Sequence, residues 1–184
     1  MRIINKLALV SLSIATLFSL TAKAQDVESL KSIQSLERTV FKRINNLPYY
    51  GVFDQIGFRV EGSTVVLTGK VAQPRNRKDA EIAIRDVPGI KAVVNNIEIL
   101  PLSPYDDAIR RKTLRTFYRD GSSLSRYVQE PRPSIRIIVE NGNITLEGNV
   151  TYKSDSDFAY MLARTVTGVF NVTNNLTVGT EMYR

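Results

Sequence analysis

Four basic side chains recur at a helical spacing in the second half of the chain: Arg111, Lys112, Arg115 and Arg119. Successive residues of an α-helix are rotated by about 100°, so these four would share about a third of the circumference. Two like-charge pairs four residues apart cost a helix a few tenths of a kcal/mol each, and no acidic residue on this face offsets them. Such a face suits anions, above all lipid headgroups. A solvated face and a site for another anion are the alternatives.

The residues that most enzymes use for catalysis are missing. The chain has no His and no Cys, which removes the common general base, the thiol nucleophile and the soft metal ligands together. A serine nucleophile would need a lysine base, and Ser122, Ser123 and Ser125 have none nearby in the sequence. The acids Asp106 and Asp107 are typical of a helix N-terminus, where they face the positive end of the dipole. We therefore expect no catalytic residue, no cofactor and no metal site.

A second group of candidate residues is aromatic and lies in two loops. Tyr49, Tyr50 and Phe53 come before one predicted hairpin, and Tyr127 lies in the long connection before another. Aromatic rings are favourable at a membrane interface, and they would add the apolar contact that basic side chains lack. The alternative is that these rings close over the core of a small domain.

The elements that must position these residues occur twice. Residues 58–99 align without a gap on residues 137–178, at an offset of 79 positions, and 12 of the 42 aligned pairs are identical. Self-similarity at a fixed period indicates the architecture directly, and each copy, at about 75 residues, is long enough to bury a small core. The sequence therefore predicts two domains, residues 25–101 and residues 102–184. Almost no linker separates them, so we expect the domains to touch or the chain to turn sharply between them.

Within each copy, the pattern predicts a leading helix, a hairpin, a second helix and a closing strand. Alternating apolar residues flank Gly62-Ser63 in the first hairpin and Asn141-Gly142 in the second, and Gly and Asn accept the positive φ of tight hairpin turns. The second leading helix is predicted to begin at Ser103, the capping residue before Pro104. The resulting fold class is α+β: two tandem αββαβ domains, each a small three-stranded sheet packed against two helices.

Single residues predict the bounds of the later elements. Asn76 and Ser154 are each followed three residues later by an acid, as helix N-caps often are. Gly89 and Gly168 are the expected C-caps, because glycine accepts the left-handed conformation. A closing strand is then expected over residues 90–100 in the first copy and residues 169–178 in the second.

The N-terminal residues predict export. A basic start is followed by an apolar run over residues 7–20, and Ala22-Lys23-Ala24 forms a small-x-small cleavage site before Gln25. The apolar run is shorter than the roughly 20 residues that span a bilayer. We therefore expect residues 1–24 to be a signal peptide and the mature chain, which lacks Cys, not to be a lipoprotein. Its 22 basic and 18 acidic residues leave a net charge of +4, which is too mild to predict nucleic-acid binding.

The repeated segments resemble the BON domain, a module named for bacterial osmotically inducible and nodulation proteins. Residues 60–71 and 139–150 share Val-Glu before the hairpin turn and Leu-x-Gly-x-Val after it, and residues 87–96 and 166–175 both end in Asn-Asn. The tandem is similar to that of periplasmic two-BON proteins. This resemblance implies an envelope protein without enzymatic activity, associated with membrane integrity or osmotic stress, with phospholipid binding proposed as the activity of the module.

We therefore expect a non-enzymatic periplasmic protein that binds anionic phospholipid weakly, or associates with the membrane surface, and supports envelope integrity or stress tolerance. Its partners would be the membrane surface or envelope proteins, with neither nucleic acid nor a small-molecule substrate. The alternative is a periplasmic protein-interaction or chaperone-like stress module without lipid affinity, which would use the tyrosine-rich loops as its contact surface.

Overall fold

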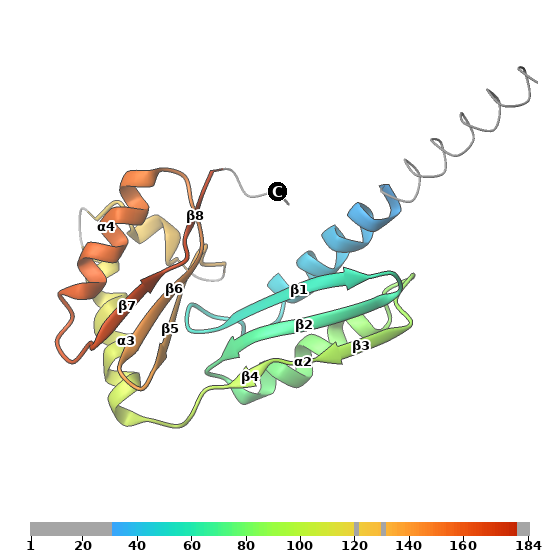
Figure 1. Ribbon diagram of the computed structural model, residues 1–184, viewed down its shortest axis with the longest axis horizontal. Helices are drawn as coiled ribbons and strands as arrows, with labels where there is room; N and C mark the ends of the chain where they lie inside the picture. Colours follow the sequence, from blue (N-terminus) through green and yellow to red (C-terminus); the bar gives the residue numbers. More distant parts are fainter. Residues whose placement is uncertain (1–30, 120–121, 130–131, 180–184) are drawn as a thin grey trace, which may run out of the picture.

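The structure is a computed structural model that describes residues 31–119, 122–129 and 132–179. Two small sheets lie next to each other, each covered by helices (Figure 1). Each domain has the predicted order of helix, hairpin, helix and closing strand, so the predicted α+β class with two αββαβ domains is confirmed. The predicted signal peptide, residues 1–24, lies outside the described residues.

The first domain starts with a leading helix, which covers residues 31–45 of the described chain. The hairpin consists of β1 (Gln55–Glu61) and β2 (Thr64–Val71), which are antiparallel. Helix α2 (Pro74–Arg85) then returns the chain, so that β3 (Ala92–Asn95) and β4 (Glu98–Ile99) both lie parallel to β2. The core lies between this sheet and the helices, and Leu67 and Ile84 are fully buried in it.

The second domain repeats this order with a longer connection after its leading helix. Helix α3 (Pro104–Phe117) leads to a single 3-10 turn, η1 (Ser125–Tyr127), and to the antiparallel hairpin of β5 (Ile135–Glu140) and β6 (Asn143–Val150). Helix α4 (Lys153–Arg164) follows, and β7 (Asn171–Asn174) and β8 (Thr177–Val178) lie parallel to β6. The second core is centred on Leu146 and Phe117, both fully buried.

Each closing strand is broken in two, so the continuous strands predicted over residues 90–100 and 169–178 are wrong. Asn95 Oδ1 accepts a hydrogen bond from the Ile97 N–H, and Asn174 Oδ1 accepts one from the Leu176 N–H, both at 3.2 Å. An Asn side chain that bonds the backbone two residues ahead offers an alternative to the ladder of a strand. The shared Asn-Asn pair therefore marks a bend in the strand.

The N-caps predicted at Asn76 and Ser154 are also wrong. The N-caps of α2 and α4 are Gln73 and Tyr152, and neither side chain makes a capping hydrogen bond. Asn76 is instead buried, and its Nδ2 donates to Tyr49 O at 2.8 Å and to Asp54 Oδ2 at 3.0 Å. Its side chain therefore holds a loop and does not begin a helix. Ser154 lies within α4 and is exposed.

The two expected C-cap glycines lie beyond their helices, whose C-caps are Asp86 and Thr165. Gly89 has a φ of 99° and Gly168 a φ of 96°. Each is the third residue of a four-residue turn, closed from Ile90 N to Val87 O in the first domain and from Val169 N to Val166 O in the second. Positive φ at that position is typical of a type II turn, where glycine is favoured.

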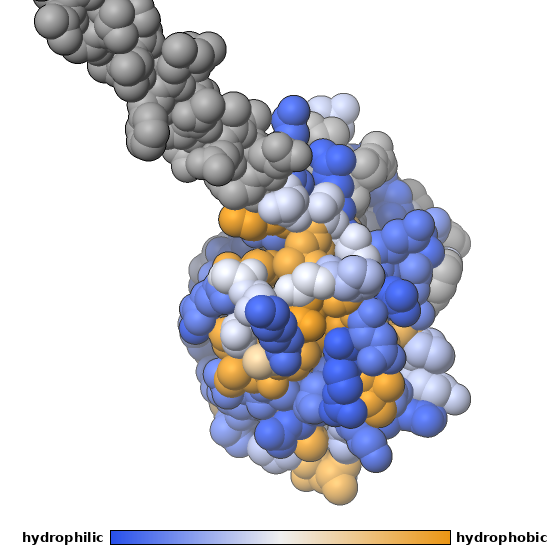
Figure 2. Space-filling model, turned by 90° about the vertical axis from the view of Figure 1, so that its right-hand side faces the viewer, coloured by the Kyte–Doolittle hydropathy of each residue, from blue (hydrophilic) through white to orange (hydrophobic). Residues whose placement is uncertain are grey.

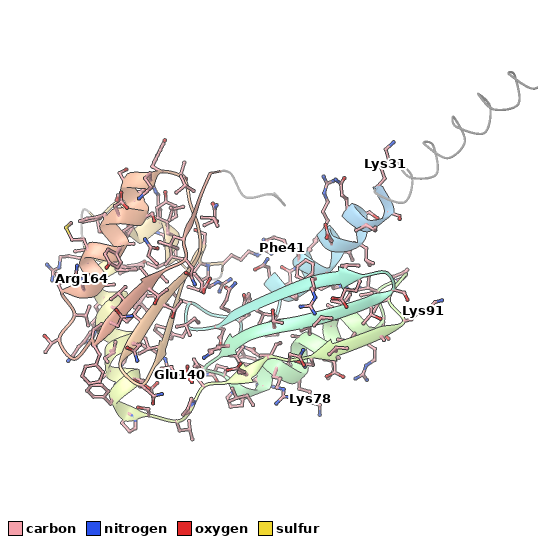
Figure 3. All side chains as sticks on the ribbon, in the orientation of Figure 1. Lys31, Phe41, Lys78, Lys91, Glu140 and Arg164 are labelled. Atoms are coloured by element: carbon pink, nitrogen blue, oxygen red, sulfur yellow. The ribbon has the colours of Figure 1, made fainter. Side chains whose placement is uncertain are left out.

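The domains contact each other through residues 51–53 of the first domain, which lie against β5. Val52 O accepts a hydrogen bond from the Ile137 N–H at 2.7 Å, and the Val52 side chain is buried within the second core. Arg136 Nη1 donates to Gly51 O at 2.7 Å. Farther along the junction, Lys70 Nζ donates to Glu140 Oε2 at 2.5 Å, and Figure 3 labels Glu140 at that point. The domains therefore touch as expected, and one contributes to the core of the other.

The two cores are closed to different degrees. Ile137 and Val139 are completely buried, whereas their equivalents at the offset of 79, Phe58 and Val60, are only partly buried. Helix α3 lies along β5, but the leading helix rises away from β1 toward residue 31 (Figure 1), and residues 31–35 are exposed. Figure 2, which looks onto the end of the first domain, shows apolar surface in the middle of that face. The first core therefore keeps an accessible apolar rim.

The contribution of residue 52 to the second core is tested by Val52→Ala. Removing two methyl groups from this buried position should lower the free energy of unfolding by about 2 kcal/mol, which is a loss of about 4–8 °C in melting temperature for a chain of this size. Val94→Ala, at a side chain 43% exposed, is the control and should cost less than half as much. Equal losses of melting temperature for the two variants would contradict the burial of Val52 in the second core.

Candidate functional site

The four basic residues lie on and just beyond α3. Ser103 caps this helix as predicted, because its Oγ accepts a hydrogen bond from the Asp106 N–H at 3.1 Å, and Pro104 occupies the first turn. The apolar side of α3, with Ile109 and Phe117, is buried against the sheet. Packing of that side against β5 leaves the opposite side of the helix facing outward.

We call Arg111, Lys112, Arg115 and Arg119 the basic face. All four side chains are exposed, and Arg119 follows the helix by two residues. Lys112 Nζ lies 3.5 Å from Thr167 O, in the turn after α4. The three arginines form no hydrogen bond or ion pair with any residue that the structure describes. The structure thus brings the predicted residues together as a surface of positive charge, which is uncompensated among the described residues.

The two acids in the first turn of α3 are used elsewhere. Asp106 is buried and accepts hydrogen bonds from the Asn141 N–H at 3.0 Å and the Gly142 N–H at 2.8 Å, so it holds the tip of the β5–β6 hairpin. Asp107 pairs with Arg110 at 2.5 Å. Arg110 is itself buried and donates to Val139 O. Neither carboxylate is paired with the basic face.

Tyr50 does not offer its ring to the surface. It is buried, and its hydroxyl accepts a hydrogen bond from the Ile56 N–H at 3.0 Å. Burial raises the pKa of Tyr50, although the charge of Arg136 opposes the rise. Asp54 beside it accepts from Ala72 N at 2.8 Å, and burial raises the pKa of this carboxyl despite such hydrogen bonds. The loop before β1 is therefore tied inward by polar contacts.

Tyr127 is buried in the same way in the second domain. Its hydroxyl donates to Asp155 Oδ2 at 2.7 Å and accepts from the Thr151 N–H at 3.1 Å. Ser123 Oγ and Arg126 Nη2 also donate to Asp155, at 2.9 Å and 2.7 Å. Burial by itself raises the pKa of Asp155, but the hydrogen bonds from Tyr127, Ser123 and Arg126 outweigh it and bring the pKa below its ordinary value.

The prediction that Tyr50 and Tyr127 supply interfacial rings is therefore wrong, because both rings close over the cores. Phe53 is half-buried and packs against the second core. Tyr49 alone among the four aromatic candidates is exposed, at 53%, and the Arg75 guanidinium lies 4.1 Å from the centre of its ring.

An exposed pair of rings that the sequence analysis missed lies beside the basic face. Phe170 is 74% exposed and Tyr105 is 47% exposed, and their ring centres are 6.0 Å apart. Tyr105 donates its hydroxyl to Gly168 O at 2.5 Å, next to the carbonyl of Thr167 that Lys112 approaches. We call Tyr105 and Phe170 the aromatic pair. The repeat holds a signal for it, because Lys91 occupies the position of Phe170 in the first copy.

Comparison with known proteins gives one family. A family model described as the BON domain matches residues 34–101 and again residues 106–180. A comparison with curated proteins finds no match.

Two solved structures are similar over most of the chain. One, from structural studies of CdsD, a structural protein of the type III secretion system of Chlamydia trachomatis, is 11% identical, covers 80% of this chain and 94% of its own, and has a TM-score of 0.27. The other, of the C-terminal domain of the same protein, is 12% identical, covers 78% of this chain and 96% of its own, and has a TM-score of 0.26. At these TM-scores, neither bears on the function of this chain.

The carboxylate that holds Tyr127 is tested by Asp155→Asn. Because the pKa of Asp155 is lowered in the folded state, its contribution to stability is present above the ordinary pKa of an aspartate and is lost as the pH falls through the lowered value. At pH 7 the variant should lose about 2 kcal/mol of unfolding free energy, since hydrogen bonds to a charged group are replaced by weaker ones. In urea denaturation, this deficit should shrink toward pH 2.

Asp157→Asn is the control, because Asp157 is exposed and pairs only with Lys153 at the surface. It should change the unfolding free energy by less than about 1 kcal/mol. A deficit for Asp155→Asn that is the same at pH 7 and at pH 2 would show that the charge of Asp155 does not hold the loop.

Proposed function

This chain belongs to the BON domain family, and from that premise we propose that it binds anionic phospholipid surfaces weakly, through its second domain and without catalysing a reaction. The family itself indicates a non-enzymatic protein of the envelope or the membrane surface. The proposal includes export to the periplasm with cleavage before Gln25, and a division of the mature chain between residues 101 and 102. Among the described residues, no helix is long and apolar enough to cross a membrane.

The uncompensated charge of the basic face is the observation that carries this proposal. Like charges at Arg111 and Arg115 oppose helix formation, and Arg119 adds a third positive charge just beyond the end of α3. An anionic partner would neutralise this charge. Each basic residue near an anionic membrane surface contributes about 1 kcal/mol. Four of them give about 4 kcal/mol, which corresponds to a Kd of about 1 mM. Charge alone therefore provides steering and only weak binding.

The aromatic pair supports the proposal by adding apolar contact next to the charges. Lys112 and Tyr105 both approach the turn at residues 167–168, so the basic face continues into the exposed rings. Burying the Phe170 ring at the headgroup boundary would add about 2 kcal/mol. The combined free energy of about 6 kcal/mol corresponds to a Kd of tens of micromolar, which is sufficient for reversible association with a membrane.

A protein-interaction or chaperone-like module without lipid affinity is the second candidate. The outer side of α4 favours it, because Met161 is exposed and Arg164 lies over the ring of Tyr160 at 5.6 Å; Figure 3 labels Arg164 on this side of the domain. Exposed Met and Arg side chains beside a partly buried Tyr are typical of protein interfaces. An envelope protein as partner would then replace the lipid surface.

Charge reversal tests the basic face. Arg115→Glu with Arg119→Glu should remove about 4 kcal/mol of attraction to vesicles that contain anionic phospholipid, a loss of about a thousandfold in affinity. The control is Arg77→Glu with Lys78→Glu, which changes the net charge equally at exposed positions of the first domain. Vesicle flotation should show binding for the parent and this control and none for the first variant. If both double variants bind equally, the basic face is only a solvated face.

Phe170→Ala tests the aromatic pair separately. The change should weaken binding to the same vesicles by about tenfold or more, since it removes an apolar group of about 2 kcal/mol. This loss should be nearly independent of salt, whereas the contribution of the basic face should fall steeply with ionic strength. Met161→Ala, on the exposed side of α4, is the control and should bind like the parent. Unchanged binding of Phe170→Ala would remove the aromatic pair from the site.

A further inference from the structure

A cleft of about 380 Å³ lies between the leading helix and β1 on one side and the second sheet on the other. Its walls on the first-domain side include Phe41, Ile44 and Phe58, and on the second-domain side they include Arg136 and Glu147. Figure 3 labels Phe41 on the part of the leading helix that lies toward the second domain. The cleft is in the size range of sites for small ligands, and the basic face of α3 takes no part in it.

Arg136 brings a buried positive charge to this cleft. Its side chain is only 5% exposed, and the guanidinium lies 4.1 Å from the centre of the Tyr50 ring. Its one hydrogen bond to a described residue is the bond from Nη1 to Gly51 O. A guanidinium carries five N–H donors, and burial of a charge is costly unless the charge is paired.

The carboxylates around Arg136 are occupied by other groups. Glu147 stands opposite Arg136 in the β5–β6 register, where an oppositely charged pair is usually favourable, but Glu147 Oε1 accepts a hydrogen bond from Asn175 Nδ2 at 2.7 Å. Asp54 accepts hydrogen bonds from three backbone N–H groups and from Asn76. Arg136 forms no ion pair within 4.0 Å of a carboxylate in the described parts of the chain. Within the described chain, the cleft therefore contains a nearly buried guanidinium that no carboxylate contacts directly, although its charge also acts on Asp54 from farther away.

The rest of the cleft wall is apolar where the first core is open. Phe58 is only partly buried, although its equivalent Ile137 is completely buried in the second domain. Phe41 and Ile44 extend the same wall from the leading helix. An apolar body lying against these side chains would complete the burial that the first domain lacks.

We propose that this cleft binds an amphiphilic monocarboxylate, with the carboxylate on the guanidinium of Arg136 and the apolar body against Phe41 and Phe58. Arginine suits this role because its planar donors match the two oxygens of a carboxylate. Glu147 on the opposite strand disfavours ligands with several negative charges, which is why the single charge of a monocarboxylate fits best. The site is independent of vesicle binding by the second domain.

Monomeric decanoate is the probe, titrated into the 15N-labelled full-length mature protein in the absence of vesicles. We expect saturable shifts of the Arg136 Nε–H and of backbone amides around the cleft. Arg136→Gln should weaken decanoate binding at least tenfold, because the ligand loses its charged donors. Decanol, which has the apolar body without the charge, and acetate, which has the charge without the body, should both bind much more weakly than decanoate.

Arg132→Gln is the matched control, because Arg132 also joins the domains, from Nη2 to Asn46 Oδ1 at 2.6 Å, but does not line this cleft. Phe41→Ala keeps Arg136 and should still weaken decanoate, so the test does not depend on the stability of Arg136→Gln. Arg115→Glu with Arg119→Glu should bind decanoate like the parent, which separates this site from the proposed membrane contact. The absence of saturable shifts in the parent, or equal affinity of Arg136→Gln and the parent, would overturn the proposal.

Discussion

The contact of Val52 with β5 is the interaction on which the arrangement of the two domains depends. β5 is an edge strand, and the Ile137 N–H that would otherwise face solvent donates to Val52 O. The Val52 side chain enters the second core at the same point, and Arg136 holds the preceding carbonyl of Gly51. A short connection such as that between β4 and α3 limits how far the domains can separate, but it does not fix their relative orientation. Val52 fixes that orientation, because its backbone covers the edge of β5 while its side chain fills part of the second core.

Buried carboxylates then determine which aromatic rings reach the surface. Asn76 and Asp155 occupy equivalent positions, in the first turns of α2 and α4. In the first domain the loop supplies the carboxylate, Asp54, and Asn76 donates to it. In the second domain the helix supplies the carboxylate, Asp155, and the loop supplies the donors, among them Tyr127. The two loops differ in length and sequence, yet each is drawn inward by a charge that cannot be left unpaired in a core. Because both loops are held inward, Tyr50 and Tyr127 are buried, and neither ring can contact a membrane or a partner at the surface.

The exposed basic and aromatic side chains are distributed unevenly between the two copies. The second copy has a closed core and presents the basic face and the aromatic pair on its outside. The first copy has Lys91 where the second has Phe170, and its partly open core borders the cleft that contains Arg136. Duplication of one fold has thus produced one domain with a surface suited to an interface and another whose incomplete core meets its neighbour. Helical spacing predicts three residues of the basic face, because Arg111, Lys112 and Arg115 lie within about one turn of α3, whereas Arg119, predicted on the same helix, follows its end. The aromatic pair joins residues from α3 and from the turn after α4, so no local spacing reveals it.

The sequence by itself determined the repeat, through an alignment of its two halves, and also both hairpins, the start of α3 at Ser103 and the outward direction of its basic residues. Local patterns explain all of these except the repeat. In each case neighbours along the chain set the outcome through a period of 2 or 3.6 residues, a turn dipeptide or a capping hydroxyl. The tertiary structure decided where groups distant in sequence find their partners. Asn76 caps no helix because Asp54 and Tyr49 O lie within its reach, and the closing strands break because Asn95 and Asn174 satisfy backbone donors themselves. Val52 belongs to the second core, and Arg136 contacts no carboxylate of the described residues, for the same physical reason: burial and pairing depend on positions in space that no periodicity encodes.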